Sequence, residues 1–98
     1  MRFTSYRNLE RAARRHPSSM AAVERWFFAI TRLDAPGLVA LRKVFPATDQ
    51  VGNTLVFNIG GNNFRLLCCV DWLRQWLFFR ALLTHAEYDR TNVEELCP

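Results

Sequence analysis

The sequence has no long apolar run, few cysteines and almost no lysine. No stretch approaches the ~20 consecutive apolar residues that a membrane-spanning helix needs. The N-terminus lacks the apolar core of a secretory signal. These absences argue against a membrane-spanning protein and against secretion, so we predict a cytoplasmic protein with no membrane partner.

The cysteines and histidines are arranged unfavourably for crosslinks and metal sites. Cys68 and Cys69 are adjacent, so a strand would point them to opposite faces, and Cys97 lies in the C-terminal tail. No C-x-x-C or H-x-x-x-H spacing is present, and His16 and His85 are far apart. We therefore expect no disulfide framework, a reducing compartment, no metal ion and no other cofactor.

The basic residues are almost all arginine. Of the 13 lysine and arginine residues only Lys43 is a lysine, and the formal net charge is +4. Arginine makes bidentate contacts with phosphate and stacks on bases, so the composition favours a polyanionic partner. Genomic base composition explains the same arginine content, so charge alone leaves the partner open.

Length and apolar periodicity predict one α+β domain, residues 1–98, with a single core. Apolar residues at helical spacing predict two or three N-terminal helices, each ended by proline or by Asp and Pro. They cover residues 6–16, 19–33 and 37–45, and residues 47–53 are expected to form a loop.

The second half of the chain predicts strands. The segments "TLVFNI" and "NFRLLCCV" flank a turn at Gly60, Gly61 and Asn62, and "WLFFRALL" follows after a short connection. That connection is too short for a crossover helix, so we expect an antiparallel meander with helices on one face. An opening strand at "MRF" is compatible with this sheet.

Strand parity places polar residues on one face. A four-residue turn at positions 60–63 sets Asn58 opposite Arg65, and a tight second turn would pair Arg65 with Arg80. The three would form one row across three strands. Adjacent arginines repel, so we expect either a bound anion between them or an ion pair with an acid such as Glu24 or Glu87.

A capping box follows the third strand. Thr84-x-x-Glu87 predicts a short helix that begins at His85, with Tyr88 and Asp89 on the same face as His85. Such a face can supply an acid and a base. An ordinary C-terminal helix whose His and Tyr pack on the sheet edge explains the same pattern, so both readings stay open.

The stretches "VFNIGGNNFR" and "RALLTHAEYD", with "VFP" at positions 44–46, resemble the HigB toxins, mRNA interferases of type II toxin-antitoxin modules within the RelE-like group. The resemblance spans roughly residues 7–89 and is strongest after residue 56. The positions that fit the family pattern are Asn58, Gly61, Asn62, Arg65, Arg80, Thr84, His85, Glu87, Tyr88 and Asp89.

The resemblance implies a RelE-like fold, in which helices pack on a small curved antiparallel sheet with a short C-terminal helix. It implies metal-free cleavage of mRNA in the ribosomal A site, which inhibits translation. It also implies a HigA-type antitoxin that carries a helix-turn-helix, so that DNA is contacted only through the antitoxin.

Metal-free RNA cleavage needs a base for the 2′-OH, cations around the phosphorane and an acid for the departing 5′-oxygen. Arg65 and Arg80 are assigned to the phosphate and His85 to the base. Tyr88 is the acid or a stacking platform, and Asp89 orients His85 or acts as base itself. Residues assigned to RNA or ribosome binding are Asn58, Asn62, Arg74, Arg7, Arg11 and Arg14.

One feature departs from the family pattern, because members often carry lysines in the hairpin where this chain has Gly60 and Asn63. A catalytically degenerate protein that binds RNA or an antitoxin is therefore the alternative. A pure interaction subunit is a further alternative, in which a partner chain covers the apolar residues of the arginine face, which are Val56, Leu67, Trp76 and Phe78.

Overall fold

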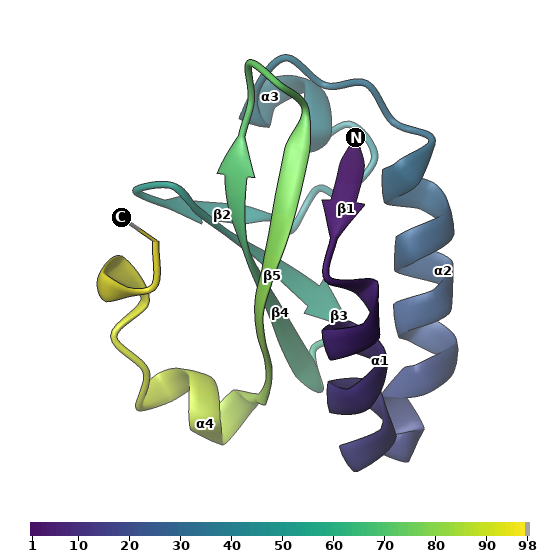
Figure 1. Cartoon of the computed structure of the whole chain (residues 1–98). Coiled ribbons are helices and arrows are strands. Elements are labelled where there is room, and N and C mark those ends of the chain that lie inside the picture. The colour runs from purple at the N-terminus through teal and green to yellow at the C-terminus, as the bar shows by residue number, and fades with distance from the viewer. Residues whose placement is uncertain (98) are drawn as a thin grey trace.

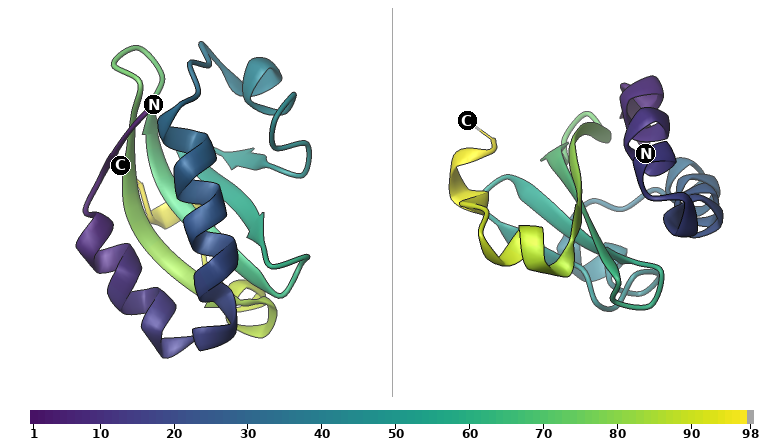
Figure 2. Two further views of the ribbon diagram at one scale, coloured as in Figure 1. Left: turned by 90° about the vertical axis from the view of Figure 1, so that its right-hand side faces the viewer. Right: turned by 90° about the horizontal axis from the view of Figure 1, so that it is seen from below.

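The computed structural model describes residues 1–97 as a five-stranded sheet with helices on one face (Figures 1 and 2). Within these residues no helix combines the length and apolar character needed to cross a membrane. The elements are β1 Arg2–Thr4, α1 Tyr6–Arg15, η1 Pro17–Ser19, α2 Met20–Thr31, α3 Leu38–Leu41, β2 Asp49–Val51, β3 Thr54–Ile59, β4 Phe64–Asp71, β5 Trp76–Thr84, α4 His85–Asp89 and η2 Val93–Glu95.

The sheet has the order β1-β5-β4-β3-β2. The predicted antiparallel meander of β3, β4 and β5 is confirmed. The opening strand is also confirmed, but it pairs parallel to β5, so the sheet is mixed. The expectation of a loop at 47–53 is wrong for Asp49–Val51, which pairs antiparallel with β3. Strand β2 is a short edge strand formed by backbone pairing, which its mixed polar composition did not reveal.

The first two helices lie where apolar spacing predicts them, and α3 is shorter than predicted. Residues 42–45 continue as a turn, in which Lys43 N and Val44 N bond three residues back and Phe45 N still donates to the Leu41 carbonyl at 2.9 Å. Leu41 is fully buried, whereas Val39 and Val44 are exposed, so little of this segment's apolar surface is packed. Helix formation without a packed face is marginal at this length.

The core lies between the sheet and helices α1 and α2. Leu9 and Ile30 from the helices and Phe57 and Leu66 from the sheet are fully buried. The Trp26 ring meets Phe57 edge to face, with centroids 5.1 Å apart. Burial of each such large side chain stabilises the fold by about 1.5–3 kcal/mol.

The opposite face of the sheet, here called the outer face, is covered by the C-terminal segment (Figure 2). Val56 and Leu67 point to this face and are buried outside the main core. The hydroxyl of Thr54 donates to the carbonyl oxygen of Val93 at 3.4 Å. The chain itself therefore covers much of the apolar surface that sequence analysis offered to a partner.

A disulfide fastens this segment, so the expectation that the cysteines form no disulfide framework is wrong. Cys69 and Cys97 are bonded, with Cα atoms 5.7 Å apart. Strand parity correctly pointed Cys68 and Cys69 to opposite faces, but the path of the tail over the outer face is a long-range feature. Cys68 stays free in the core, where burial raises the pKa of its thiol far above its ordinary value.

Cys97→Ser should lower the free energy of unfolding by about 3 kcal/mol, because the disulfide closes a loop of 28 residues' separation. Urea unfolding of the oxidised protein and the variant measures the difference. Dithiothreitol should lower the stability of the wild type to that of Cys97→Ser and leave the variant unchanged. Equal stability of the oxidised wild type and Cys97→Ser would contradict the role given to the crosslink.

Candidate active site

The β3–β4 hairpin and helix α4 meet at one end of the sheet. Phe64 begins β4 and pairs with Thr84, the last residue of β5, so α4 starts beside the hairpin turn. Asn58 pairs with Arg65 as predicted, and both belong to the outer face. The structure thus brings together residues from three strands and the C-terminal helix.

The hairpin side of this site is held by Asn62, whose φ of 90° lies in the left-handed region that a tight turn requires. Its side-chain oxygen accepts from Asn58 Nδ2 at 3.0 Å, and its carbonyl accepts from Arg65 Nη1 at 2.9 Å. The Arg65 guanidinium carbon lies 5.8 Å from the centre of the Tyr88 ring. Arg65 Nε and Nη2 have no hydrogen-bond partner among residues 1–97, so they remain available to an anion.

The predicted capping box is confirmed. Glu87 N donates to Thr84 Oγ1 at 3.2 Å, and Thr84 N donates to Glu87 Oε1 at 2.8 Å. The first turn of α4 presents His85, whose Nδ1 lies 3.1 Å from Asp89 Oδ2. A proton on Nδ1 completes this hydrogen bond and leaves Nε2 as a free, exposed acceptor. The pair is therefore arranged like a base and the carboxylate that orients it.

Glu87 makes this helix sensitive to acid. The backbone N–H of Thr84, and secondly its hydroxyl, hold the pKa of Glu87 below its ordinary value. A carboxylate with a lowered folded-state pKa stabilises the fold above the unfolded pKa, and this stability is lost as pH falls through the folded value. Glu87→Gln should therefore be less stable than wild type at pH 7 and lose less stability between pH 7 and about pH 3. Urea unfolding at the two pH values measures this, and parallel acid losses would contradict the assignment.

Arg80 does not join Arg65, so the predicted row of Asn58, Arg65 and Arg80 is wrong. Arg65 pairs with Leu83, and Arg80 lies three residues away along β5, roughly 10 Å at ~3.3 Å per residue. The second turn is two residues longer than assumed, since Asp71 pairs with Trp76, and a bulge at Leu67/Cys68 shifts the register by one more. A bulge of this kind points Arg80 to the outer face near Cys69, and Arg80 Nε donates to Cys69 Sγ at 3.1 Å.

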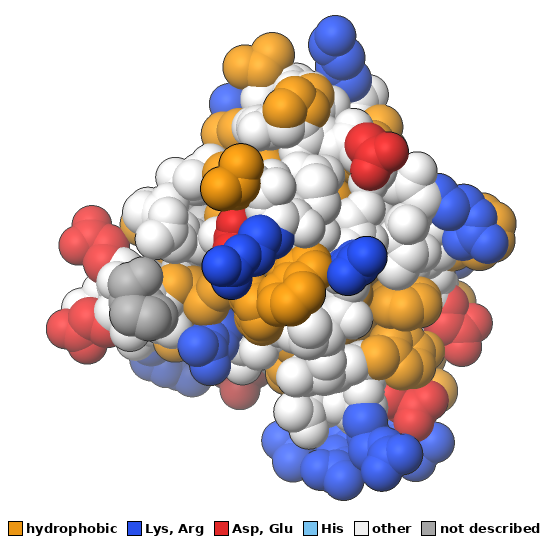
Figure 3. All heavy atoms as spheres, turned by 45° about the horizontal axis from the view of Figure 1, so that its top comes forward, with side chains coloured by type: hydrophobic (Ala, Val, Ile, Leu, Met, Phe, Trp, Pro, Cys, Tyr) orange, Lys and Arg blue, Asp and Glu red, His pale blue; other side chains and the backbone are white. Residues whose placement is uncertain are grey.

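Two of the arginines assigned to binding, Arg74 and Arg14, are paired with acids outside α4. Arg74 is in the β4–β5 turn, at the opposite end of β4 (Figure 1), and its Nε lies 3.9 Å from Asp71 Oδ2. Arg14 on α1 lies 3.4 Å from Glu10. Basic side chains gather at the lower edge of the molecule in Figure 3, where α1 lies.

Arg15 and His16 also contribute to the polar surface near α4, which the sequence did not indicate. With Arg11 and Arg80 they line a groove of about 540 Å³ between α1 and β5. The ring of His16 also packs against Phe64, with centroids 5.3 Å apart. The signal in the sequence was the i, i+4 spacing of Arg11 and Arg15, but nothing local says that this side of α1 faces β5.

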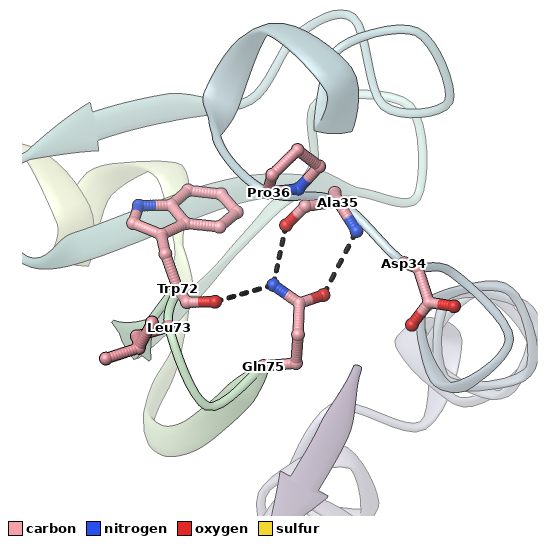
Figure 4. Close-up of a pocket in the computed structure, with 6 residues that line it drawn as sticks. All are labelled: Asp34, Ala35, Pro36, Trp72, Leu73 and Gln75. Carbon is pink, nitrogen blue, oxygen red and sulfur yellow. Dashed lines mark hydrogen bonds between the residues drawn. The ribbon is translucent and has the colours of Figure 1, made fainter.

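A larger hollow, of about 610 Å³, lies at the end of the sheet opposite α4, between the loop after α2 and the β4–β5 turn (Figure 4). Gln75 Nε2 donates to the carbonyls of Ala35 and Trp72, each at 2.7 Å, and Gln75 Oε1 accepts from Ala35 N at 3.0 Å. The amide is fully used in holding the loop to the turn. This hollow is therefore a structural joint, and the polar groups suited to chemistry lie around α4.

No three His, Cys, Asp or Glu side chains gather as a possible metal site within the part of the chain that the structure describes. The groups available at α4 are an imidazole with its carboxylate, a guanidinium and a phenol. These can transfer protons and hold an anion.

Comparison with known proteins identifies the family of this chain. Residues 19–91 match the family model described as HigB toxin, RelE-like toxic component of a toxin-antitoxin system. The chain is 27% identical over 93 residues to "mRNA interferase HigB" of Escherichia coli O6:H1, which covers 92% of this chain and 90% of that protein. It is 38% identical over 53 residues, 51% of each chain, to "mRNA interferase toxin HigB" of Escherichia coli K12 and to "mRNA interferase HigB" of Shigella flexneri. The family match covers the hairpin, β5 and α4, and the chain therefore belongs to the HigB toxin family, the RelE-like toxic component of a toxin-antitoxin system.

Proposed function

We propose that this chain is an endoribonuclease that cleaves mRNA on the translating ribosome, in the A site, and so inhibits translation. The observation that carries the proposal is the His85–Asp89 pair at 3.1 Å on a helix whose Tyr88 lies beneath the Arg65 guanidinium. The names of the similar enterobacterial proteins support the same activity.

Each step of RNA cleavage has a group in this site. His85 Nε2 takes the proton from the 2′-OH, and Asp89 holds the ring and stabilises its cationic form. Arg65 binds the phosphate through the N–H groups that the protein leaves free. Tyr88 donates a proton to the departing 5′-oxygen or stacks on a base. Side chains fill all of these roles, so the proposed reaction needs no metal ion.

The proposed partners are the mRNA, the ribosome and a HigA-type antitoxin with a helix-turn-helix, through which DNA is reached indirectly. Such a protein would act in the cytoplasm, where translating ribosomes are found. The antitoxin would neutralise the toxin by covering or distorting the α4 site.

The proposal is tested by incubating the purified protein with a defined mRNA, either free or on stalled ribosomes, with the magnesium that ribosomes need kept throughout. The reactions are run with and without 1,10-phenanthroline, which removes transition metals and leaves magnesium in place. Primer extension maps the cuts. We expect cuts within the A-site codon, only on ribosome-bound mRNA and unchanged by the chelator. Absence of cleavage on ribosomes would remove the proposal, and loss of cleavage with the chelator would show that the protein uses a transition metal.

The second candidate is a catalytically degenerate member of the same family. It is favoured by the hairpin tip, where Gly60, Gly61 and Asn63 supply no charge. Such a protein would bind ribosomes or the antitoxin and cut no mRNA. Ribosome co-sedimentation without cleavage in the assay above would favour it.

A further inference from the structure

The groove between α1 and β5 is distinct from the α4 site and has no role in the proposed chemistry. Its lining comes from one side of α1, from β5 beyond the part that β1 covers, and from α4, with the residues Asn8, Arg11, Ala12, Arg15, His16, Phe79, Arg80, Ala81, Leu82, Leu83 and Glu87. Strand β1 pairs only with Trp76, Leu77 and Phe78, so the rest of the β5 edge opens toward α1.

The groove concentrates positive charge that the protein does not neutralise. Arg11 and Arg15 are exposed and four residues apart, so their like charges repel each other on the same side of the helix. Neither has an ion-pair partner in residues 1–97. The nearby Arg14 contrasts with them, because it is paired with Glu10 and lies outside the groove.

The single acid in the lining is already engaged. Glu87 accepts the backbone N–H of Thr84 at 2.8 Å, in the capping box. The two hydrogen bonds with Thr84 are the main causes of the lowered pKa of Glu87, and the charge of His16, which also lines the groove, is a smaller one. The groove therefore presents the unpaired guanidiniums of Arg11 and Arg15. Arg80 also lines it, and its Nε donates to Cys69 Sγ at 3.1 Å. The one carboxylate in the lining serves α4.

The groove is connected to the α4 site. Glu87 stands between His85 and Tyr88 in α4, and it lines the groove, as does Arg80. A strand of RNA with its scissile phosphate at Arg65 would pass from α4 along β5 if it followed the positive charge. The exposed, planar guanidiniums of Arg11 and Arg15 suit a phosphodiester backbone, which offers one anionic group per nucleotide.

We infer that this groove binds the RNA backbone next to the cleaved bond, with Arg11 and Arg15 contacting successive phosphates; the inference rests on the proposed function. Arg80 closes the groove on the strand side and links it to the active face. A basic surface that attracts RNA only through its net charge would use all four arginines of α1 equally. The groove predicts instead that Arg11 and Arg15 bind RNA and that Arg7 and Arg14 do not.

The test compares two double variants that remove the same charge from the same helix, Arg11→Ala/Arg15→Ala and Arg7→Ala/Arg14→Ala. The probe is a fluorescein-labelled ten-nucleotide RNA with 2′-O-methyl groups, which cannot be cleaved, so binding is measured independently of catalysis. We expect the groove double to weaken binding about tenfold or more and to reduce the salt slope by about 1.4, the value for two phosphate contacts on a single strand. Arg7→Ala/Arg14→Ala should weaken binding less than about threefold, because these charges would act on the RNA only at a distance, through solvent in which salt screens them.

Equal losses in the two doubles would overturn the inference, since they would show only an effect of net charge. A larger loss in Arg7→Ala/Arg14→Ala would also overturn it. Decaglutamate peptide is the second probe, and an equal loss of affinity for peptide and RNA in Arg11→Ala/Arg15→Ala would show a site for acidic protein segments and overturn the inference.

If mRNA on ribosomes is not cut but the two double variants still differ in RNA binding, the proposed catalysis is wrong and the proposed RNA-binding groove is supported. Thermal unfolding of both doubles should match the wild type, because all four side chains are exposed.

Discussion

Arg65→Ala is expected to lower kcat for mRNA cleavage by about a hundredfold or more, because the phosphate loses the guanidinium that is held over Tyr88. Arg65 is half-buried and bonds only to hairpin carbonyls, so its loss should change the melting temperature little. Arg65→Lys should restore little activity, since an ammonium cannot make the bidentate contact. Single-turnover cleavage on ribosomes measures the effect.

Arg80→Ala is the matched comparison for Arg65→Ala. The longer β4–β5 turn and the bulge together place Arg80 three residues along β5 from the residue paired with Arg65, roughly 10 Å at ~3.3 Å per residue. We therefore expect Arg80→Ala to raise KM with a kcat within a few-fold of wild type, which is the pattern for lost uniform binding. If both variants lost kcat equally, Arg65 and Arg80 would both contact the scissile phosphate. The separate roles that we infer from their distance along β5 would then be wrong. A wild-type rate in Arg65→Ala would remove Arg65 from the mechanism.

The local features of the site could be predicted from the sequence, because each is set by residues close together in the chain. Two glycines and Asn62 force a four-residue turn, and the turn alone fixes Asn58 opposite Arg65. Thr84 and Glu87 cap a helix through contacts three residues apart. The predicted shared face of His85 and Asp89 follows from the cap and is confirmed.

The place of Arg80 could not be predicted in the same way. Its partner depends on the length of the β4–β5 turn and on a bulge at Leu67/Cys68, and each changes the register without changing the apolar pattern. The apolar pattern of residues 78–82 fits both the predicted and the observed pairing of β4 with β5, because Phe79 and Leu82 both face the core.

Long-range packing explains the remaining differences. Cys69 and Cys97 are 28 positions apart, and only the path of the tail across the outer face brings them together. Likewise Arg11 and Arg80 line one groove because α1 packs beside β5 where β1 ends. No periodicity in either segment encodes that contact.

His85→Ala and Tyr88→Phe should each reduce cleavage by about a hundredfold or more, the usual loss when a general base or acid is removed. Neither should change the melting temperature, because His85 is exposed and Tyr88 is only half-buried. Thr84→Ala is the matched control on the same helix. It removes the hydroxyl that accepts Glu87 N and should cost about 1 kcal/mol of stability while activity falls only moderately.

The pH profile decides between His85 and Asp89 as the base. If His85 is the base, single-turnover cleavage should rise with pH, because only the neutral imidazole can take the proton from the 2′-OH. Asp89→Asn should keep part of this rise but lower the rate throughout, because the ring loses the carboxylate 3.1 Å from Nδ1. A rate in the wild type that does not depend on pH, or a rise that survives in His85→Ala, would remove His85 from the mechanism. Asp89 would then be the remaining group on α4 able to take the proton from the 2′-OH.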